Sequence, residues 1–158
     1  MTDAQLIGIA QYAVARTPGK LCCLGLGSCV AVFLYDPTAK IGGVVHILLP
    51  KAPNGHSSDA KYADTGIRLL LDQLASKGAD RRRIRAKLIG GARMFKELDL
   101  TMSDIGKENI AECRRTLTEL GIRVVAEEVE GDRGRSAYFS MEDGMATIRT
   151  AFSQDRRI

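Results

Sequence analysis

Residues 24–49 have the sequence LGLGSCVAVFLYDPTAKIGGVVHILL, and this stretch decides the fold. It contains two apolar runs, 30–35 and 41–49, that are rich in β-branched residues and are joined by a short connection holding Asp36 and Pro37. Two such runs around a turn signal predict an antiparallel β-hairpin. Gly27 and Ser28 lead into Cys29, and the glycine permits a close approach of the backbone. The pattern therefore predicts a buried hairpin with a cysteine at the entrance of its first strand.

A single histidine, His46, lies in the second run of this predicted hairpin. With a turn centred near residue 38, residues near 29 and 46 lie opposite each other. A slip of one residue would turn His46 to the other face of the sheet, because side chains alternate along a strand. The hairpin thus offers a way to place a thiol and an imidazole side by side.

The remaining chain alternates strand and helix patterns. Strands are expected over 6–14, 21–24, 84–89 and 122–129, and a terminal hairpin over 135–140 and 145–150. Amphipathic helices are expected over 61–77 and 106–120, each followed by a glycine that stops it. The polar tail, 152–158, is expected to be loose. Together these elements predict one α/β domain over residues 1–158, a sandwich with a β core and helices packed outside.

Length and composition place the chain among ordinary globular proteins. It has 158 residues, of which 45% are hydrophobic and 27% are charged, and a formal net charge of +4. The first ten residues do not resemble a signal peptide, and no apolar run approaches the roughly 18 residues of a membrane span. The cytoplasm is therefore the expected compartment.

The basic residues Arg81, Arg82, Arg83 and Arg85 form the most evident charged cluster. Aromatic residues make up only 5% of the chain, and no base-stacking or recognition-helix pattern accompanies the arginines. Nucleic-acid binding is therefore disfavoured. A solvated connection between a helix and a strand, or a contact with an acidic partner, explains the cluster better.

The chain has four cysteines, at positions 22, 23, 29 and 113. They do not indicate a disulfide framework, because disulfides are rare in the cytoplasm, the expected compartment of this chain. A zinc site would have to combine Cys22, Cys23, Cys29 and His46, but no C-x-x-C pair is present, and neighbouring side chains on a strand point to opposite faces. No metal is therefore expected. Cys113 falls on the apolar face of the second helix and is expected in the core.

Two loops border the predicted site. Residues 51–59 are polar and directly follow the histidine strand, so they are the candidate rim or lid. Residues 90–95 form a glycine-rich turn that lacks the phosphate-loop pattern, so close backbone packing is the favoured interpretation and no nucleotide cofactor is expected.

Cys29 and His46 each have a purely structural interpretation, because a lone cysteine or histidine in an apolar strand is usually a core residue. Their predicted proximity, together with the preceding Gly-Ser, instead favours a thiol–imidazole pair that generates a nucleophilic thiolate. Spacing alone leaves both interpretations open.

The chain resembles the chemoreceptor glutamine deamidases of the CheD family. The resemblance extends in order from about Ile7 to Ser140 and is carried by the blocks 24–32, 36–37, 42–50, 61–65, 89–95, 105–106 with Asn109, and 131–136. It implies an α/β sandwich related to deamidating bacterial toxins. It also implies a cysteine hydrolase that converts receptor glutamines to glutamate, and some members hydrolyse receptor methyl esters. CheC, a phosphatase of phosphorylated CheY, is the implied protein partner.

The resemblance places the family's nucleophile on Cys29 and its base on His46. Cys29 would form a thioester with the glutamine side chain, while backbone N–H groups around Gly27, Ser28 and Val30 hold the oxyanion. The chain is expected to act as a monomer and without a cofactor.

One position departs from the family pattern. The family's third catalytic member is a threonine six residues before the cysteine, where it orients the histidine, and this chain has Cys23 there. A thiol is the weaker hydrogen-bonding group. An active deamidase with Cys23 as third member is favoured over a weakened homologue that mainly binds a CheC-type phosphatase. A general thiol hydrolase of small amides is a third, disfavoured alternative.

Overall fold

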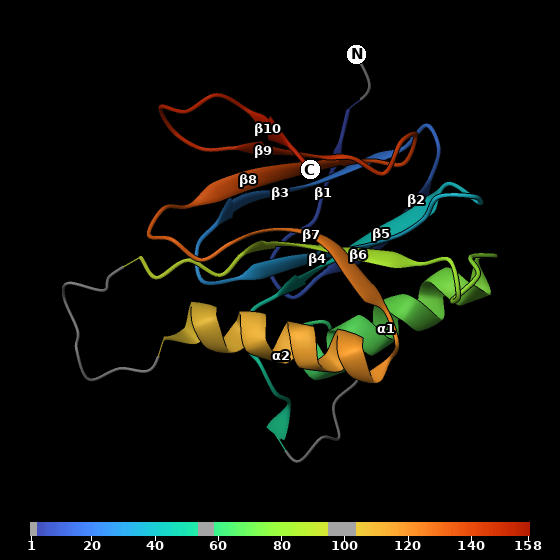
Figure 1. Cartoon of the computed structure of the whole chain (residues 1–158), viewed down its shortest axis with the longest axis horizontal. Coiled ribbons are helices and arrows are strands. Elements are labelled where there is room, and N and C mark those ends of the chain that lie inside the picture. Colours follow the sequence, from blue (N-terminus) through green and yellow to red (C-terminus); the bar gives the residue numbers. More distant parts are fainter. Residues whose placement is uncertain (1–2, 54–58, 95–103) are drawn as a thin grey trace.

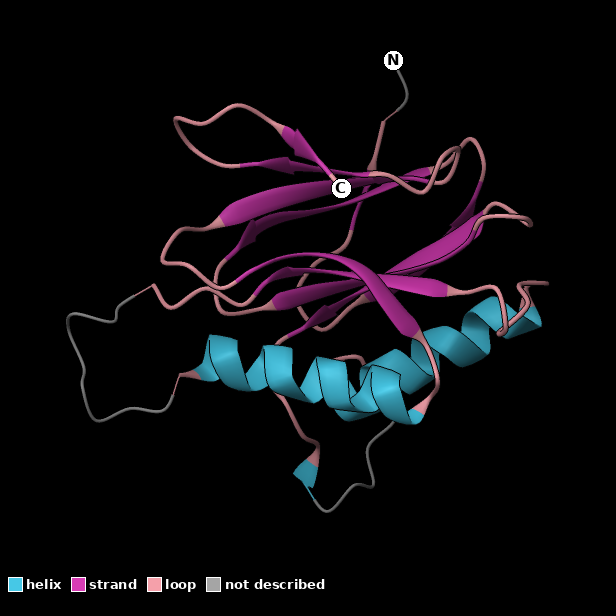
Figure 2. Cartoon of the chain, in the orientation of Figure 1, coloured by secondary structure: helices cyan, strands magenta, loops and turns pink. Residues whose placement is uncertain are grey.

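The described residues form two β-sheets and a layer that contains helices α1 (Ala63–Ser76) and α2 (Ile105–Glu119) (Figures 1 and 2). The computed structural model describes residues 3–53, 59–94 and 104–158. The two sheets lie face to face, and both helices cover the free face of one of them, so that this sheet is the middle layer of three. The predicted sandwich with helices outside is confirmed.

The middle sheet contains the predicted hairpin at its centre. Its strands are, in spatial order, β2 (Tyr12–Arg16), β5 (Ile41–Ile47), β4 (Val30–Asp36), β6 (Arg85–Gly90) and β7 (Arg123–Val129). All residues of β4 and β5 are buried. A strand covered on both faces needs apolar residues at successive positions, which explains the uninterrupted apolar runs of the sequence.

The outer sheet packs one of its faces against the middle sheet. Its strands are, in spatial order, β1 (Gln5–Leu6), β3 (Lys20–Leu26), β8 (Arg135–Ser140), β9 (Ala146–Arg149) and β10 (Arg156–Arg157). Along β8, fully buried residues alternate with partly exposed ones. This alternation is typical of an antiparallel strand with one face on the core.

The helices α1 (Ala63–Ser76) and α2 (Ile105–Glu119) pack on the middle sheet, close to their predicted bounds. Helix α1 buries Ile67, Leu70, Leu71 and Leu74, which recur with the spacing of one helix face. Helix α2 buries Cys113 completely, so its predicted place in the core is confirmed. The Asp104 side chain caps α2 by accepting a hydrogen bond from the Lys107 amide at 3.0 Å.

The register of the β4–β5 hairpin differs from the expected one by two residues. His46 lies opposite Ala31, not opposite Cys29. Because side chains alternate with a period of two, a shift of two residues preserves the face on which each side chain lies. Cys29, Ala31 and the β5 residue Val44 all pack in the layer between the two sheets. The expected proximity of positions 29 and 46 therefore survives the shift.

Two predictions about the chain ends are wrong. The single strand expected over 6–14 is divided into β1 and β2, which belong to different sheets, and Ala10 has φ +64° in the crossing between them. The tail expected to be loose ends in β10, which pairs with β9, and Ile158 exchanges two 2.9 Å backbone hydrogen bonds with Ala146. These bonds use the backbone, so the polar side chains gave no indication of them.

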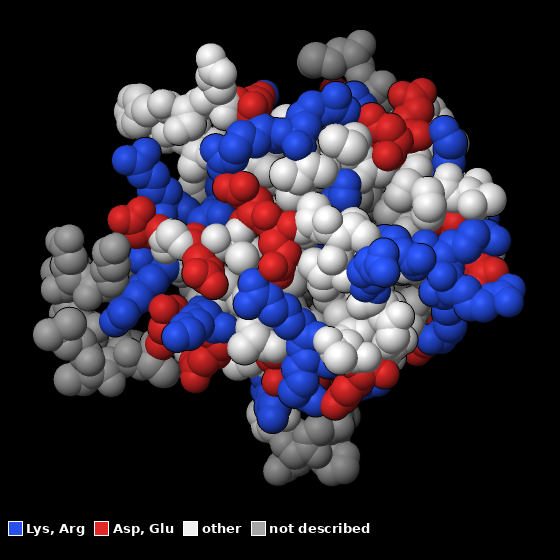
Figure 3. Space-filling model, in the orientation of Figure 1, with Lys and Arg blue, Asp and Glu red and all other residues white. Residues whose placement is uncertain are grey.

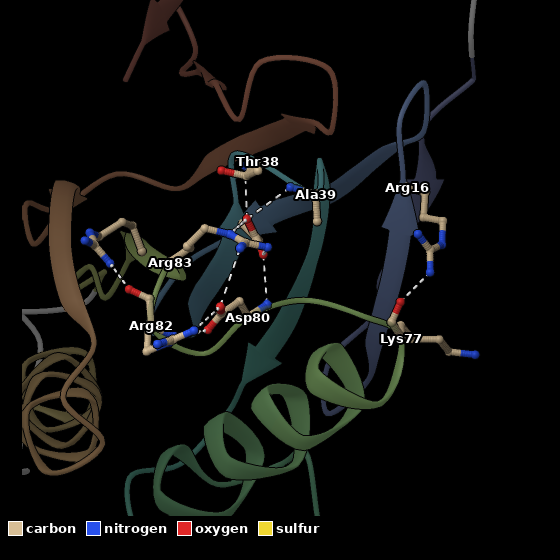
Figure 4. Close-up of polar contacts among 9 residues, drawn as sticks. Arg16, Thr38, Ala39, Lys77, Asp80, Arg82 and Arg83 are labelled. Atoms are coloured by element: carbon tan, nitrogen blue, oxygen red, sulfur yellow. Dashed lines mark hydrogen bonds and ion pairs between the residues drawn. The ribbon is translucent and has the colours of Figure 1, made fainter.

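The arginines at 81–85 are engaged within the molecule, and Figure 4 shows Arg82 and Arg83 in contact with Asp80. Arg81 pairs with Asp72 at 2.6 Å, and Arg83 pairs with the buried Asp36 at 2.9 Å. On the face shown in Figure 3, acidic side chains lie among the basic ones over much of the surface. The structure thus favours the solvated, structural interpretation of this cluster over a nucleic-acid surface.

Asp36 is the centre of this arginine network. Its carboxylate accepts hydrogen bonds from Arg83 and from the backbone amides of Thr38, Ala39 and Asp80. Burial alone would raise the pKa of Asp36, but these hydrogen bonds outweigh it and hold the pKa well below its usual range. The network joins the β4–β5 turn to the start of β6.

Candidate active site

Cys29 lies where the chain crosses from the outer sheet to the middle sheet. Strand β3 ends at Leu26 in one sheet and β4 begins at Val30 in the other, so residues 27–29 form the crossing. Cys29 is 7% exposed and packs between the sheets. The thiol is thus at one end of the sandwich, held by strands on both sides.

The glycine-rich turn after β6 supports this crossing. The amides of Gly91 and Ala92 each donate a 2.8 Å hydrogen bond, to the carbonyl oxygens of Cys29 and Gly27 respectively. A Cβ added at Gly90, which has φ +116°, would lie only 2.2 Å from the Cys29 oxygen. Close backbone packing is confirmed as the role of the described part of the turn. Phe95, at the end of the predicted turn, lies outside the described residues.

His46 is buried in β5, and its side chain contacts the segment between β1 and β2. Its Nδ1 atom lies 3.2 Å from the carbonyl oxygen of Ile7. A carbonyl oxygen only accepts hydrogen bonds, so Nδ1 is the nitrogen that carries the proton in this contact. The other ring nitrogen, Nε2, is then the basic atom of the neutral imidazole.

The backbone of His46 is fixed by the same segment. Its amide donates to the Gln11 oxygen at 3.0 Å, and its carbonyl accepts from the Ala10 amide at 2.9 Å. With the Ile7 contact, three hydrogen bonds from five consecutive residues surround His46. The segment that was expected to be part of one strand therefore orients the predicted base.

The structure brings Cys29 and His46 to the same face of the middle sheet on neighbouring strands. His46 lies opposite Ala31, two residues along β4 from Cys29, which makes the pair diagonal neighbours. In antiparallel sheets such neighbours are about 7–8 Å apart, a separation that an imidazole side chain can bridge. The arrangement makes a thiol and an imidazole diagonal neighbours.

Burial keeps both groups neutral in the free protein. It raises the pKa of the Cys29 thiol above its ordinary value of 9.0. It also lowers the pKa of His46 below 6.5, an effect that the hydrogen bond to Ile7 opposes. A thiol with a raised pKa beside an imidazole with a lowered one favours a neutral resting pair over a resting thiolate–imidazolium pair at pH 7.

Cys23 and Cys22 lie on opposite faces of β3, as expected of successive strand residues. Cys23 is fully buried between the sheets with Cys29, and Cys22 is outside that cluster. Burial, with smaller contributions from Cys22 and Cys29, raises the pKa of Cys23 to about 12. Among the described residues, no hydrogen bond joins Cys23 to His46. Within the same residues, no cluster of histidine, cysteine or carboxylate side chains could hold a metal ion.

The residues expected to support the oxyanion differ in their backbone bonding. Val30 is the first residue of β4 and pairs with both Ile47 and Gly90. The amides of Gly27, Ser28 and Cys29, in contrast, donate no hydrogen bond to any other residue in the described parts of the chain. An oxyanion needs free backbone donors. The loop amides therefore suit this role better than the amide of Val30.

Two groups near the site carried no functional prediction. The Ile7 carbonyl belongs to the backbone, and an apolar residue gives no sign that its carbonyl contacts a histidine. Asn109 is fully buried on α2, and its Nδ2 atom donates to the carbonyl oxygens of Ser28 and Leu48, both at 3.0 Å. An asparagine among the apolar residues of an amphipathic helix was the available signal.

The candidate lid follows the histidine strand, as the sequence places it. Leu49 pairs with Tyr62 in an isolated bridge, and the Ala52 amide donates to Asp64 at 3.1 Å. Residues 54–58 of the predicted lid lie outside the described residues. No helix within the described segments is long and apolar enough to cross a membrane.

Comparison with known proteins identifies the family. A family model described as "CheD chemotactic sensory transduction" matches residues 48–150. A "Probable chemoreceptor glutamine deamidase CheD" from Desulforamulus reducens is 47% identical, and the match covers 91% of this chain and 89% of that protein. This chain belongs to the CheD family.

Two further CheD relatives come from other organisms. The "Chemoreceptor glutamine deamidase CheD" of Thermotoga maritima is 39% identical over 92% of this chain and 90% of its own length. A probable deamidase of the same name from Archaeoglobus fulgidus is 41% identical, covering 91% of each chain. Among solved structures, the Bacillus licheniformis hypothetical protein YfiH overlaps 77% of this chain and about half of its own (49%), with 19% identity and a TM-score of 0.47.

Proposed function

We propose that this CheD family member is a cysteine hydrolase that deamidates glutamine side chains of chemoreceptors to glutamate, a protein-glutamine glutaminase. The observation that carries the proposal is that Cys29 and His46 are diagonal neighbours on one face of the middle sheet, with Nδ1 of His46 3.2 Å from the Ile7 carbonyl oxygen. This contact leaves Nε2 as the base for the thiol. The names of the relatives from Desulforamulus reducens and Thermotoga maritima supply the substrate class.

The reaction begins with the neutral pair. Nε2 of His46 takes the proton of the Cys29 thiol as the sulfur attacks the side-chain carbonyl carbon of the glutamine and the C–S bond forms. Negative charge develops on the carbonyl oxygen, where the amides of the 27–29 loop, which donate to no other described residue, stabilise it. The imidazolium then gives its proton to the departing nitrogen as the C–N bond breaks, which releases ammonia and leaves a thioester.

Hydrolysis of the thioester repeats the sequence with water. His46 accepts a proton from the attacking water, and collapse of the second tetrahedral intermediate breaks the C–S bond. The proton returns to the Cys29 sulfur, and the carboxylic acid that forms releases its remaining proton to solvent and becomes glutamate. The oxidation state of carbon and sulfur does not change in either half of the reaction.

The test is ammonia release from a purified receptor cytoplasmic fragment, with peptide mass spectrometry to locate each converted glutamine. Wild type is compared with Cys29→Ala and Cys113→Ala. The second variant removes a thiol that is buried in α2, in the helix-facing core, and is the matched control. Loss of the nucleophile should lower turnover by at least about 10³-fold, whereas Cys113→Ala should keep it. A Cys29→Ala variant that still deamidates receptor would overturn the assignment.

A second candidate function is favoured by Cys23, which stands where the family has a threonine. In that case the chain is a weakened homologue that mainly binds and regulates a CheC-type phosphatase of CheY. It predicts binding of the phosphatase without receptor turnover, and turnover gained in Cys23→Thr. The contact between His46 and Ile7 supports the active enzyme instead, because it orients the base without help from position 23.

A further inference from the structure

We infer that Asn109 is a positioning residue that fixes the loop of the nucleophile to the end of the histidine strand. This inference rests on the deamidase activity proposed above. The Nδ2 atom of Asn109 donates one hydrogen bond to the Ser28 oxygen and one to the Leu48 oxygen, each at 3.0 Å. Ser28 precedes Cys29, and Leu48 is two residues after His46. One amide group thus joins the backbones that carry both reacting side chains.

The bond to Ser28 also sets the direction of a donor. The only cis peptide bond in the described residues is Thr17–Pro18, so the Ser28–Cys29 peptide is trans and planar. In such a peptide the carbonyl and the following N–H point in opposite directions. By holding the Ser28 oxygen toward α2, Asn109 directs the Cys29 amide away from the helix. That amide donates to no other described residue and remains available to an oxyanion.

The fold allows the helix to come close enough for this contact. Gly106, one turn before Asn109 on α2, faces the glycine-rich turn, where an added Cβ would lie 2.5 Å from the Ala92 oxygen. Ile110 of α2 packs closely against Gly91, because a Cβ added at Gly91 would lie 2.4 Å from the Cδ1 atom of Ile110. Small residues on both elements bring α2 against the loops of the site. Asn109 is the polar group that this approach inserts.

The other half of the amide is costly to bury. Asn109 is fully buried, and its Oδ1 atom has no hydrogen-bond partner in the described parts of the chain. A buried acceptor without a partner lowers stability, and such groups are rare in folded proteins. An apolar side chain at this position would pack without the cost of a buried, unpaired oxygen. The two donors of Asn109 to the site loops give it a function that a leucine of similar volume could not perform.

The test compares Asn109→Leu and Asn109→Asp with wild type in the receptor assay. Both variants keep the approximate volume and remove the two N–H donors. We expect kcat to fall about 10²-fold while KM stays within about threefold, because substrate contacts are unchanged and the reacting groups are misplaced. Thr116→Val is the matched control, since Thr116 is also polar and fully buried on α2 but bonds only within the helix. It should keep kcat within about threefold.

Two outcomes would overturn the inference. One is an unchanged kcat in Asn109→Leu, and the other is an equal loss in Thr116→Val, which would indicate general helix packing. A readout independent of activity is the carbonyl ¹³C resonances of Ser28 and Leu48, which should move together in Asn109→Leu and stay fixed in Thr116→Val. If wild type itself does not deamidate receptor, the proposed function fails. The carbonyl resonances then still decide whether Asn109 holds the two loops.

Discussion

The Nδ1 atom of His46 lies 3.2 Å from the carbonyl oxygen of Ile7, and this contact defines which ring nitrogen can act as a base. A protonated Nδ1 donating to a carbonyl is a common way to fix an imidazole whose Nε2 does chemistry. In this chain the orienting group is a main-chain oxygen from the crossing between β1 and β2. Because this oxygen belongs to the main chain of Ile7, a substitution of Cys23 does not remove it.

The first prediction concerns the tautomer of His46. Long-range ¹H–¹⁵N correlation spectra at neutral pH should show a protonated Nδ1 and an unprotonated Nε2. The physical reason is that Ile7 offers only an acceptor, so the proton must remain on Nδ1. Spectra of Cys23→Ala should give the same pattern. A proton on Nε2 in wild type would contradict the contact and remove the base from the proposed mechanism.

The second prediction concerns Cys23, the expected third catalytic member. Because Ile7 holds the ring, Cys23→Ala should lower kcat by less than about tenfold, and Cys23→Thr should leave it within a similar range. The assay is receptor deamidation under saturating substrate. Cys22→Ala, which removes the neighbouring thiol on the opposite face of β3, is the control. A loss near that of Cys29→Ala would instead place Cys23 in the catalytic machinery.

The hairpin and the faces of Cys29 and His46 could be predicted because their signals are local. Successive apolar residues, a turn signal and the period of two fix β4, β5 and the faces of Cys29 and His46, even though the register is displaced by two residues. The two helices could also be predicted from the sequence, since an apolar residue every three or four positions defines their buried faces.

Other parts of the site could not be predicted, since the backbone or distant sequence forms them. The Ile7 carbonyl is 39 positions from His46, and Asn109 is 81 positions from Ser28. The alternation of residues 6–14 predicts one strand and does not mark the point where the chain changes sheets. The tail is a related case, since β10 is held by main-chain bonds that its polar side chains do not reveal.

The third prediction concerns the pH dependence of Cys29. Burial raises the pKa of its thiol above 9.0, so alkylation by iodoacetamide should increase with pH throughout the neutral range and reach its midpoint above pH 9. Mass spectrometry of the labelled peptide separates Cys29 from the other thiols, and unfolded protein gives the reference rate. Rapid alkylation that persists into the acid range would indicate a resting thiolate–imidazolium pair and contradict the neutral pair.

The rate of receptor deamidation should fall at acid pH, where His46 becomes protonated. The base must be neutral to take the thiol proton, and burial lowers the pKa of His46 below 6.5. Activity should therefore rise with pH through a midpoint below 6.5 and be fully present at pH 7. A midpoint above 7 would mean that an imidazolium is stabilised in the free enzyme.

The fourth prediction concerns Gly90, which lies against the nucleophile loop. In Gly90→Ala the new Cβ would clash with the Cys29 oxygen, and φ +116° is strained for alanine. We expect a loss of more than about 3 kcal/mol in the free energy of unfolding, and a lower kcat in whatever fraction folds. Gly121→Ala is the control, because Gly121 has φ +72° and a Cβ added there would meet no described atom within 4 Å. It should cost only the strain, about 1–2 kcal/mol, and leave kcat unchanged.

The fifth prediction concerns the ion pair between Arg83 and the buried Asp36, which is far from the chemistry and tests the scaffold alone. Arg83→Leu should lower the free energy of unfolding at pH 7 by about 3 kcal/mol, because it leaves a buried carboxylate with only its backbone donors. Arg82→Leu is the control, since the Arg82 side chain is 90% exposed, and it should cost less than about 0.5 kcal/mol. Equal losses in the two variants would contradict a special role for the buried pair.

The pH dependence of this pair has a definite sign. The pKa of Asp36 is lower in the folded than in the unfolded chain, so its contribution to stability is fully present above the ordinary value of 3.8. As the pH falls below 3.8 toward the folded pKa, the unfolded chain takes up the proton first and the contribution is lost. Chemical denaturation at a series of pH values should therefore show the gap between wild type and Arg83→Leu narrowing in acid. A gap that widens below pH 4 would mean that the carboxylate is not the group that Arg83 stabilises.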